Sequence, residues 1–117
     1  MHIPIGIGDI FLLCVDFQDE PEGFKERPVV VIAVSDEEVV VMAVQITSVG
    51  PKEIPTYHDQ YKLPILNWHI SGLDKPSWIK THPNNILRIE ISKLNKYKGR
   101  LHRTDLKRLL ELLESDM

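Results

Sequence analysis

Two side chains near the ends of neighbouring β-branched runs have the chemistry to bind and cleave a phosphodiester. Arg27 stands just before the run Pro28–Val34, and Thr47 directly follows Ile46 at the end of the next run. A guanidinium presents a planar fork of donors that matches two phosphate oxygens, and a neighbouring hydroxyl can donate to the same phosphate. Together they would stabilise the charge that develops during cleavage. The structural alternative is plain: Arg-Pro is a common solvated strand boundary, and Thr is a good strand residue.

The runs that carry these two residues are predicted to pair as a β-hairpin. Pro28–Val34 and Val39–Thr47 are rich in β-branched residues, and the polar segment Ser35–Glu38 between them is typical of a turn. Hairpin strands are antiparallel, so the start of the first lies beside the end of the second. Arg27 and Thr47 are therefore expected at the same end of the sheet. The proline that opens the first run is acceptable there, because a first strand residue can lack a ladder donor.

The remaining segments predict a mainly β protein that ends in one helix. Further strands are expected at Ile10–Phe17, Lys62–Leu66, Ser77–Thr81 and Ile86–Ile91, with turns at Gly72–Pro76 and His82–Asn85. After Thr104, a good N-cap, and Asp105, leucines recur at helical spacing at positions 106, 109, 110 and 113. Many short strands with a terminal helix favour an SH3-like β-barrel or a small sandwich. Without a repeat or linker, residues 1–117 are expected to form one domain.

Composition excludes several classes of protein. The 117 residues are 43% hydrophobic and 26% charged, which is an ordinary globular balance. The net charge of −3 gives no overall attraction to nucleic acid, so such binding would need a local basic cluster. No apolar stretch reaches the length of a membrane span, and the N-terminus lacks the features of a signal peptide. The lone Cys14 reads as a buried apolar residue, and a chain without an internal disulfide suits the cytoplasm.

The sequence shows no motif for a metal site or for a phosphate-binding loop. The five histidines show no metal-ligand spacing, so neither a metal nor a cofactor is expected. The glycines at 6 and 8 precede a strand rather than a helix, so they mark a turn and not a phosphate-binding loop. A ribonuclease that uses two imidazoles near one phosphate stays open, because the sequence cannot show such a pairing.

An ordered set of motifs resembles the MazF/PemK family of toxins. The motifs are Gly8-Asp-Ile10 opening a strand that ends at Asp16-Phe17, the polar loop Gln18–Glu26 leading to Arg27-Pro28, the strand Val44–Ser48, the segment Lys75–Lys80 after Gly72-Leu73, and the glycine turn Lys98–Leu101 before Thr104-Asp-Leu106. Together they cover most of the chain.

The resemblance implies an SH3-like barrel that forms a homodimer. It implies a metal-independent endoribonuclease that cleaves single-stranded RNA at short motifs, by attack of the ribose 2′-hydroxyl on the adjacent phosphate. It also implies a cognate antitoxin whose acidic segment occupies the RNA groove. The family's catalytic arginine falls on Arg27 and its catalytic hydroxyl on Thr47, while Ser48 matches a supporting polar position.

The surrounding residues suggest roles and departures from the family pattern. Arg27 is always protonated, so it is expected to stabilise the phosphate rather than to act as a base. Glu22 stands five residues before it, as an acidic residue does in some members. Many members have glycine where this chain has Lys25. Lys25, Lys80 and Lys52 are expected to form a local basic cluster with Arg27.

Two alternatives remain on the same fold. One is a non-catalytic binding module or an inactivated relative. The other is a topoisomerase poison, but that branch depends on a C-terminal Trp-Gly-Ile, and this chain ends in Glu114-Ser-Asp-Met117.

Overall fold

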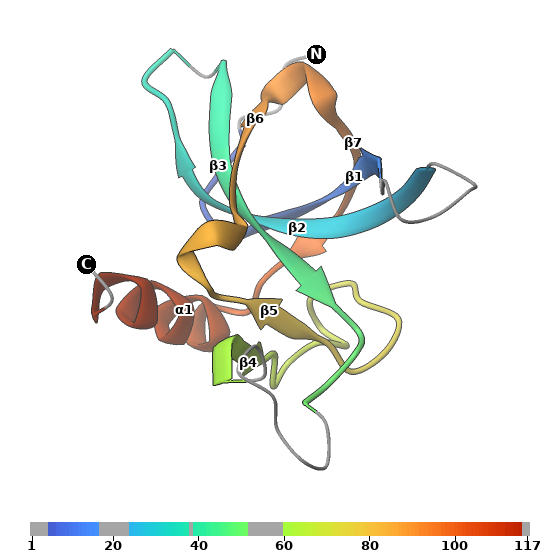
Figure 1. The fold of residues 1–117 in the computed structure, drawn as a ribbon, viewed down its shortest axis with the longest axis vertical. Helices are drawn as coiled ribbons and strands as arrows, with labels where there is room; N and C mark the ends of the chain where they lie inside the picture. The colour runs from blue at the N-terminus through green and yellow to red at the C-terminus, as the bar shows by residue number, and fades with distance from the viewer. Residues whose placement is uncertain (1–4, 17–23, 38, 52–59, 116–117) are drawn as a thin grey trace.

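The computed structural model describes residues 5–16, 24–37, 39–51 and 60–115, without the side chains of residues 14–16, 24 and 25. In these ranges seven strands form one curved antiparallel sheet, followed by a C-terminal helix (Figure 1). The elements are β1 (Asp9–Asp16), β2 (Phe24–Val34), β3 (Val40–Thr47), β4 (Lys62–Pro64), β5 (Trp78–Lys80), β6 (Ile86–Glu90), β7 (Leu94–Arg100) and α1 (Arg103–Ser115), with 3₁₀ turns η2 (Pro83–Asn85) and η3 (Ile91–Lys93). The strand order is β4-β5-β3-β2-β1-β7, and β6 also pairs with β3. The expected class, a mainly β SH3-like fold with a C-terminal helix, is confirmed, although the sheet is open rather than closed.

β3 is the central strand of the sheet, because it pairs with β2, β5 and β6. Its first residues pair with β6 on one edge and with β2 on the other, down to the Val29–Gln45 pair. Ile46 and Thr47 then pair with Ile79 and Trp78 of β5, on the edge of β3 opposite β2. The ladder to β2 has already ended at Val29, so β3 leaves β2 just before its own end.

The predicted hairpin of β2 and β3 is present, but β2 is longer than expected. It begins at Phe24, so Arg27 and Pro28 lie inside the strand rather than at its start. Both residues pair with β1 on one edge, opposite Leu13 and Leu12. On the other edge the ladder to β3 runs only as far as Val29. A proline is tolerated here because one edge of β2 needs no ladder donor at this position.

Two apolar clusters explain why the β2 and β3 runs are almost continuously hydrophobic. Val30 and Val44 face the first cluster, which includes Leu109 of α1. Val29 and Val31 face the second cluster, together with Ile89 of β6. Successive side chains of a strand point to opposite faces, so strands covered on both faces need apolar residues at every position.

The helix begins two residues earlier than the sequence indicates. The His102 carbonyl accepts the Leu106 N–H at 2.9 Å, and His102 Nδ1 accepts the Thr104 N–H at 3.2 Å. His102 is therefore the N-cap, and Thr104 lies in the first turn. Asp105 is in the first turn as expected, but it is buried.

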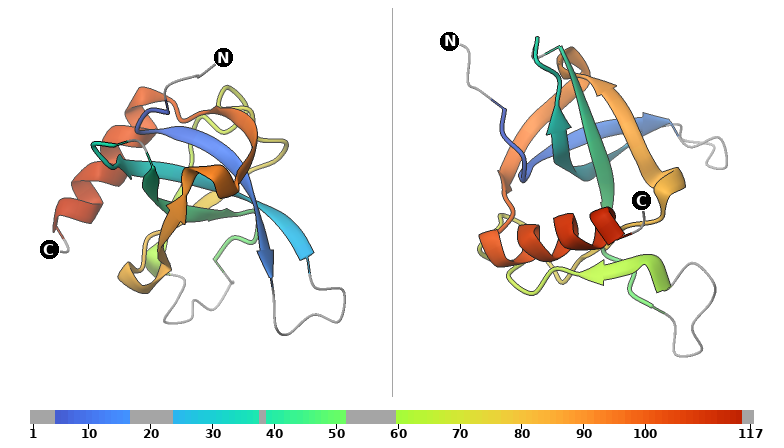
Figure 2. Two further views of the ribbon diagram at one scale, coloured as in Figure 1. Left: turned by 90° about the horizontal axis from the view of Figure 1, so that it is seen from above. Right: turned by 90° about the vertical axis from the view of Figure 1, so that its left-hand side faces the viewer.

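The buried Asp105 ties α1 to the loop between β4 and β5. Its carboxylate accepts the backbone N–H groups of Leu66 at 3.1 Å and Asn67 at 2.9 Å, and it pairs with Arg108 at 3.1 Å. Arg108 also donates to the Pro64 carbonyl at 3.0 Å. Figure 2 shows the helix lying alongside β4 accordingly.

The glycine turn expected at Lys98–Leu101 instead coincides with the end of strand β7, which the sequence pattern does not predict. Gly99 lies within that strand, and a Cβ at this position would stand 2.1 Å from the Ser71 carbonyl oxygen. Glycine is needed here for close backbone packing rather than for a turn. In the part of the chain described, no helix is long and apolar enough to cross a membrane.

Candidate functional site

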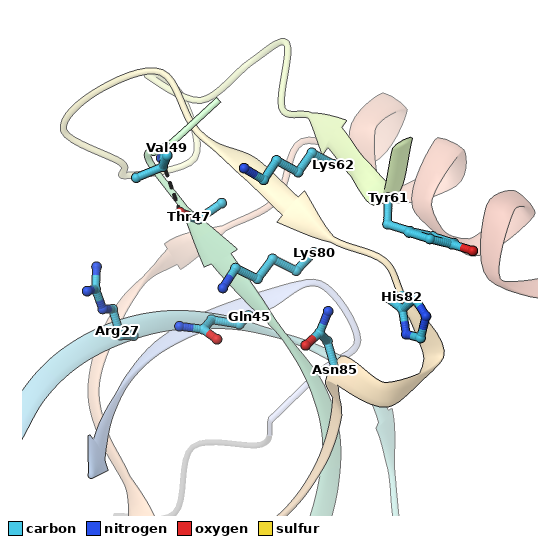
Figure 3. Close-up of a pocket in the computed structure, with 9 residues that line it drawn as sticks. All are labelled: Arg27, Gln45, Thr47, Val49, Tyr61, Lys62, Lys80, His82 and Asn85. Carbon is cyan, nitrogen blue, oxygen red and sulfur yellow. Dashed lines mark hydrogen bonds between the residues drawn. The ribbon is translucent and has the colours of Figure 1, made fainter. Parts of the chain in front are cut away.

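A cavity of about 390 Å³ opens where β3 leaves β2 and turns to pair with β5 (Figure 3). It draws on strands β2 to β5 and on turn η2. Its lining residues are Arg27, Gln45, Thr47, Val49, Tyr61, Lys62, Lys80, His82 and Asn85. Cationic and hydroxyl groups therefore share one cavity with aromatic and amide groups.

Strand periodicity brings Arg27 and Thr47 to this cavity. Val29 and Gln45 are cross-strand partners and so share one face of the sheet. Arg27 lies two residues before Val29, and Thr47 lies two residues after Gln45, so both project to that same face. The side chains of Arg27 and Thr47 line the cavity on the side shown at the left of Figure 3.

The hydroxyl of Thr47 is held in a fixed orientation. Thr47 is only 8% exposed, and its Oγ1 accepts the N–H of Val49 at 3.1 Å. This bond uses an oxygen lone pair, so the hydroxyl proton points elsewhere and can be donated to an anion in the cavity. The local turn thus prepares the group as a donor.

Two lysines contribute further positive charge. Lys62 and Lys80 are direct cross-strand partners in the β4–β5 ladder. Burial, then the charge of Lys62, and then that of Arg27 lower the pKa of Lys80 below its ordinary value of 10.5. Three cations close enough to affect one another form a site that an anion would stabilise.

The other end of the cavity is aromatic and rigid. The Tyr61 and His82 rings meet edge to face, with centroids 4.5 Å apart. His82 caps turn η2, because its Nδ1 accepts the Asn84 N–H at 3.0 Å and its carbonyl accepts the Asn85 N–H at 2.8 Å. The buried Thr81 fixes Tyr61, since both its N–H and its hydroxyl donate to the Tyr61 carbonyl at 2.7 Å.

The other residues predicted for the site have different positions. Lys80 lies in the cavity with Arg27 and Thr47. Ser48 is exposed and instead lines a neighbouring cavity of about 330 Å³, which Arg27 also borders. Lys25 pairs with Val15 in the β1–β2 ladder, but its side chain lies outside the described residues, as do Glu22 and Lys52 entirely.

Six residues that line the cavity were missed from the sequence, five of them polar or aromatic and the sixth the apolar Val49. Gln45 could have been predicted, because it stands two residues before Thr47 on a predicted strand and so faces the same side. Lys62 also lies on a predicted strand, but its register with Lys80 depends on a long connection. At the boundaries of strands and turns, residue type alone does not distinguish a site residue from a turn residue. This is the situation of Tyr61, His82 and Asn85. No three His, Cys, Asp or Glu side chains in the described ranges gather into a group that could hold a metal ion.

Comparisons with known proteins place this chain in a family. A family model described as PemK-like, MazF-like toxin of type II toxin-antitoxin system matches residues 7–115. No curated protein sequence matches the chain. Among solved structures, the chain is similar to Mycobacterium tuberculosis toxin MazF-mt6, with a TM-score of 0.59 and 18% identity over 90% of this chain and 93% of that one. That likeness supports the fold, and the family match spans nearly the whole sequence. The chain therefore belongs to the PemK-like, MazF-like family of toxins of type II toxin-antitoxin systems.

Proposed function

We propose that this protein is a metal-independent endoribonuclease that cleaves single-stranded RNA at short sequence motifs. In the cell it acts as a growth-inhibiting toxin that a cognate antitoxin neutralises. The observation that supports this best is that Arg27, Thr47 and Lys80 line the same cavity. They combine a bidentate phosphate donor, an oriented hydroxyl and an ammonium group.

In the proposed reaction the ribose 2′-hydroxyl attacks the adjacent phosphorus atom. A bond forms between O2′ and phosphorus, and the bond from phosphorus to the 5′-oxygen breaks. The 2′-hydroxyl loses its proton, and the leaving 5′-oxygen gains one. One fragment ends in a 2′,3′-cyclic phosphate, which a water molecule can then open to a terminal phosphate, and the other begins with a 5′-hydroxyl.

Each residue has a role that follows from its chemistry. Arg27 binds the nonbridging oxygens and stabilises the additional charge of the pentavalent state. Thr47 donates its hydroxyl proton to the same phosphate, since its oxygen already accepts from Val49. Lys80 adds a second cation at short range. These groups supply the charge stabilisation that a bound cation supplies in other phosphoryl-transfer sites. Glu22, Lys25 and Ser48 are proposed as further contacts to the RNA.

The partners are proposed on the same basis. The basic cavity suits an acidic extended segment of an antitoxin, because such a segment competes with RNA for the same cations. The family resemblance supports a homodimer and a cytoplasmic location.

The test is incubation of the purified protein with a long single-stranded RNA in EDTA, with the fragment ends mapped. Cleavage at a recurring motif is expected, and it should disappear in Arg27→Ala. Arg88→Ala is the matched control, since Arg88 is an exposed arginine on β6 away from the cavity. RNA that is bound but left intact by a folded wild-type protein would contradict the nuclease and support the non-catalytic binding module.

A further inference from the structure

The phosphate chemistry leaves half of the cavity unexplained. Figure 3 shows Arg27 and His82 at opposite ends of it, with Lys80 between them. The cations serve the phosphate, but the aromatic and amide groups at the other end have no role in the cleavage step. A scissile phosphate held near Arg27 would place a neighbouring nucleotide over this second end.

We infer that Tyr61, His82, Asn85 and Gln45 form a subsite for one unpaired nucleobase beside the scissile phosphate, and that this subsite sets the base preference there. The inference rests on the proposed function, because it assumes that RNA lies in the cavity. Proteins read single-stranded RNA by stacking bases on aromatic rings and by hydrogen bonds to their edges. Both kinds of group are present here.

The aromatic groups provide a surface for stacking that is already in place. Tyr61 is held by two hydrogen bonds to its carbonyl from Thr81, which is 1% exposed. The rings of Tyr61 and His82 stand at 76° to each other, so each supports the edge of the other. Because these bonds exist without RNA, little ordering is needed when a base binds.

The amide groups provide selectivity. Asn85 is half-buried and ends the turn that His82 caps, so its backbone position is fixed by the 2.8 Å bond from its own N–H. Gln45 projects from β3 two residues before Thr47. An amide carries one acceptor and two donors, and it discriminates between base edges that differ in donor and acceptor pattern.

The histidine is held for this role rather than for proton transfer through Nδ1. Its Nδ1 accepts the Asn84 N–H, so the neutral ring carries its proton on Nε2. His82→Asn tests the ring with little change to the turn, because asparagine is itself a good N-cap.

The experiment measures binding of short oligonucleotides whose 2′-O-methyl groups prevent cleavage, in four versions that differ only in the base next to the central phosphate. Wild-type protein should prefer one base over the others by about tenfold or more. In Asn85→Ala the four affinities should converge. Asn84→Ala is the matched control, since Asn84 is an exposed asparagine of the same turn and contributes only its backbone N–H.

Three variants of the two ring residues complete the test. Tyr61→Leu should weaken binding of all four versions by about tenfold or more, whereas Tyr61→Phe, which keeps the ring, should not. His82→Asn should behave like Tyr61→Leu. The inference is overturned if Asn85→Ala leaves the preference intact, or if it weakens all four versions equally.

The outcome is independent of the nuclease test. Base discrimination that depends on Asn85, without cleavage of ordinary RNA, would retain the subsite and reject the enzyme. Cleavage that depends on Arg27, with no discrimination at this position, would retain the enzyme and reject the subsite.

Discussion

Lys62 and Lys80 stand directly opposite each other in the short ladder between β4 and β5. Like charges at opposite positions of an antiparallel pair are destabilising, and both side chains are half-buried. The protein tolerates this arrangement in the wall of a cavity that already contains Arg27. A site that is destabilised by its own charges is one that an anion should stabilise.

Lys62→Gln should therefore raise the free energy of unfolding in a buffer without phosphate, by about 0.2–1 kcal/mol. Added inorganic phosphate should stabilise the wild type more than the variant, because a ligand that binds only the folded state shifts the equilibrium by mass action. Urea unfolding with and without phosphate measures both effects. Lys107→Gln on the exposed face of α1 is the control. Equal phosphate stabilisation of wild type and Lys62→Gln would contradict an anion site at the lysine pair.

The lowered pKa of Lys80 predicts how binding depends on pH. As the pH rises through that pKa, below 10.5, Lys80 loses its charge and affinity for an uncleavable RNA analogue should fall. Lys80→Arg keeps its charge throughout this range, so its affinity should decline later. Fluorescence anisotropy from neutral pH to about pH 10 makes the comparison. Matching pH profiles for the two proteins would show that Lys80 does not contact the phosphate.

The lowered pKa of Lys80 affects stability in the opposite direction to binding. Below its folded-state pKa, Lys80 is charged in both the folded and the unfolded chain. The unfavourable surroundings of this charge then lower the free energy of unfolding by their full amount. Between that pKa and 10.5, the unfolded chain holds a proton that the folded chain has released, so the contribution of this group to stability rises with pH. Binding and stability should therefore change in opposite directions over this window.

Arg27→Ala should reduce cleavage by about a hundredfold or more, because it removes one preorganised contact to the transition state. The fold should survive, since Arg27 belongs to neither apolar cluster. Arg27→Lys keeps the charge but loses the planar fork, so it should recover only part of the rate. Single-turnover rates and thermal unfolding of the same samples separate chemistry from stability. Full activity of a folded Arg27→Ala would exclude the proposed mechanism.

Thr47→Ala should reduce cleavage by about tenfold to a hundredfold, which is the range expected for a lost hydrogen bond to a charged group. Thr47→Ser keeps a hydroxyl that can accept from Val49 and donate to phosphate, so its effect should be milder. Thr47→Val preserves the shape and β-branching without the hydroxyl. If Thr47→Val cleaved as fast as Thr47→Ser, the role of Thr47 would be packing alone.

Asp105→Ala tests how firmly α1 is attached to the β4–β5 loop. The change leaves two backbone N–H groups and Arg108 without their carboxylate partner, so a loss of about 3–5 kcal/mol is expected. Glu111→Gln, in an exposed ion pair with Lys107, should change stability by less than about 0.5 kcal/mol. Urea unfolding compares the two, and similar losses would contradict the anchoring role.

The parts of the structure that the sequence predicted best are governed by local rules. β-branched runs and the turn between them predicted the β2–β3 hairpin, and leucine spacing predicted α1. The placement of Arg27 and Thr47 at the same end of the sheet needed only antiparallel geometry and the side-chain period of a strand. In each case the determining contacts lie close together in sequence.

The missed parts depend on contacts between distant segments. Strand β7 is missed, and a glycine turn is expected at its end, whereas Gly99 there allows close approach of the Ser71 backbone. The start of β2 was missed because its pairing partner at that end is β1 rather than β3. Lys62, Tyr61 and His82 enter the cavity only through the β4–β5 register and the bonds of Thr81, neither of which local composition encodes.

The way β3 changes partners also orders the events of folding. The β2–β3 hairpin closes over a short turn, whereas the pairing of Thr47 with Trp78 closes a much longer loop and costs more chain entropy. The hairpin is therefore expected to form first, with β5 docking later. At that stage Arg27 and Gln45 are already held beside each other, while Lys80 and His82 have yet to arrive. A newly made chain thus acquires its framework before its cavity, and the cavity is complete only with the last long-range contacts.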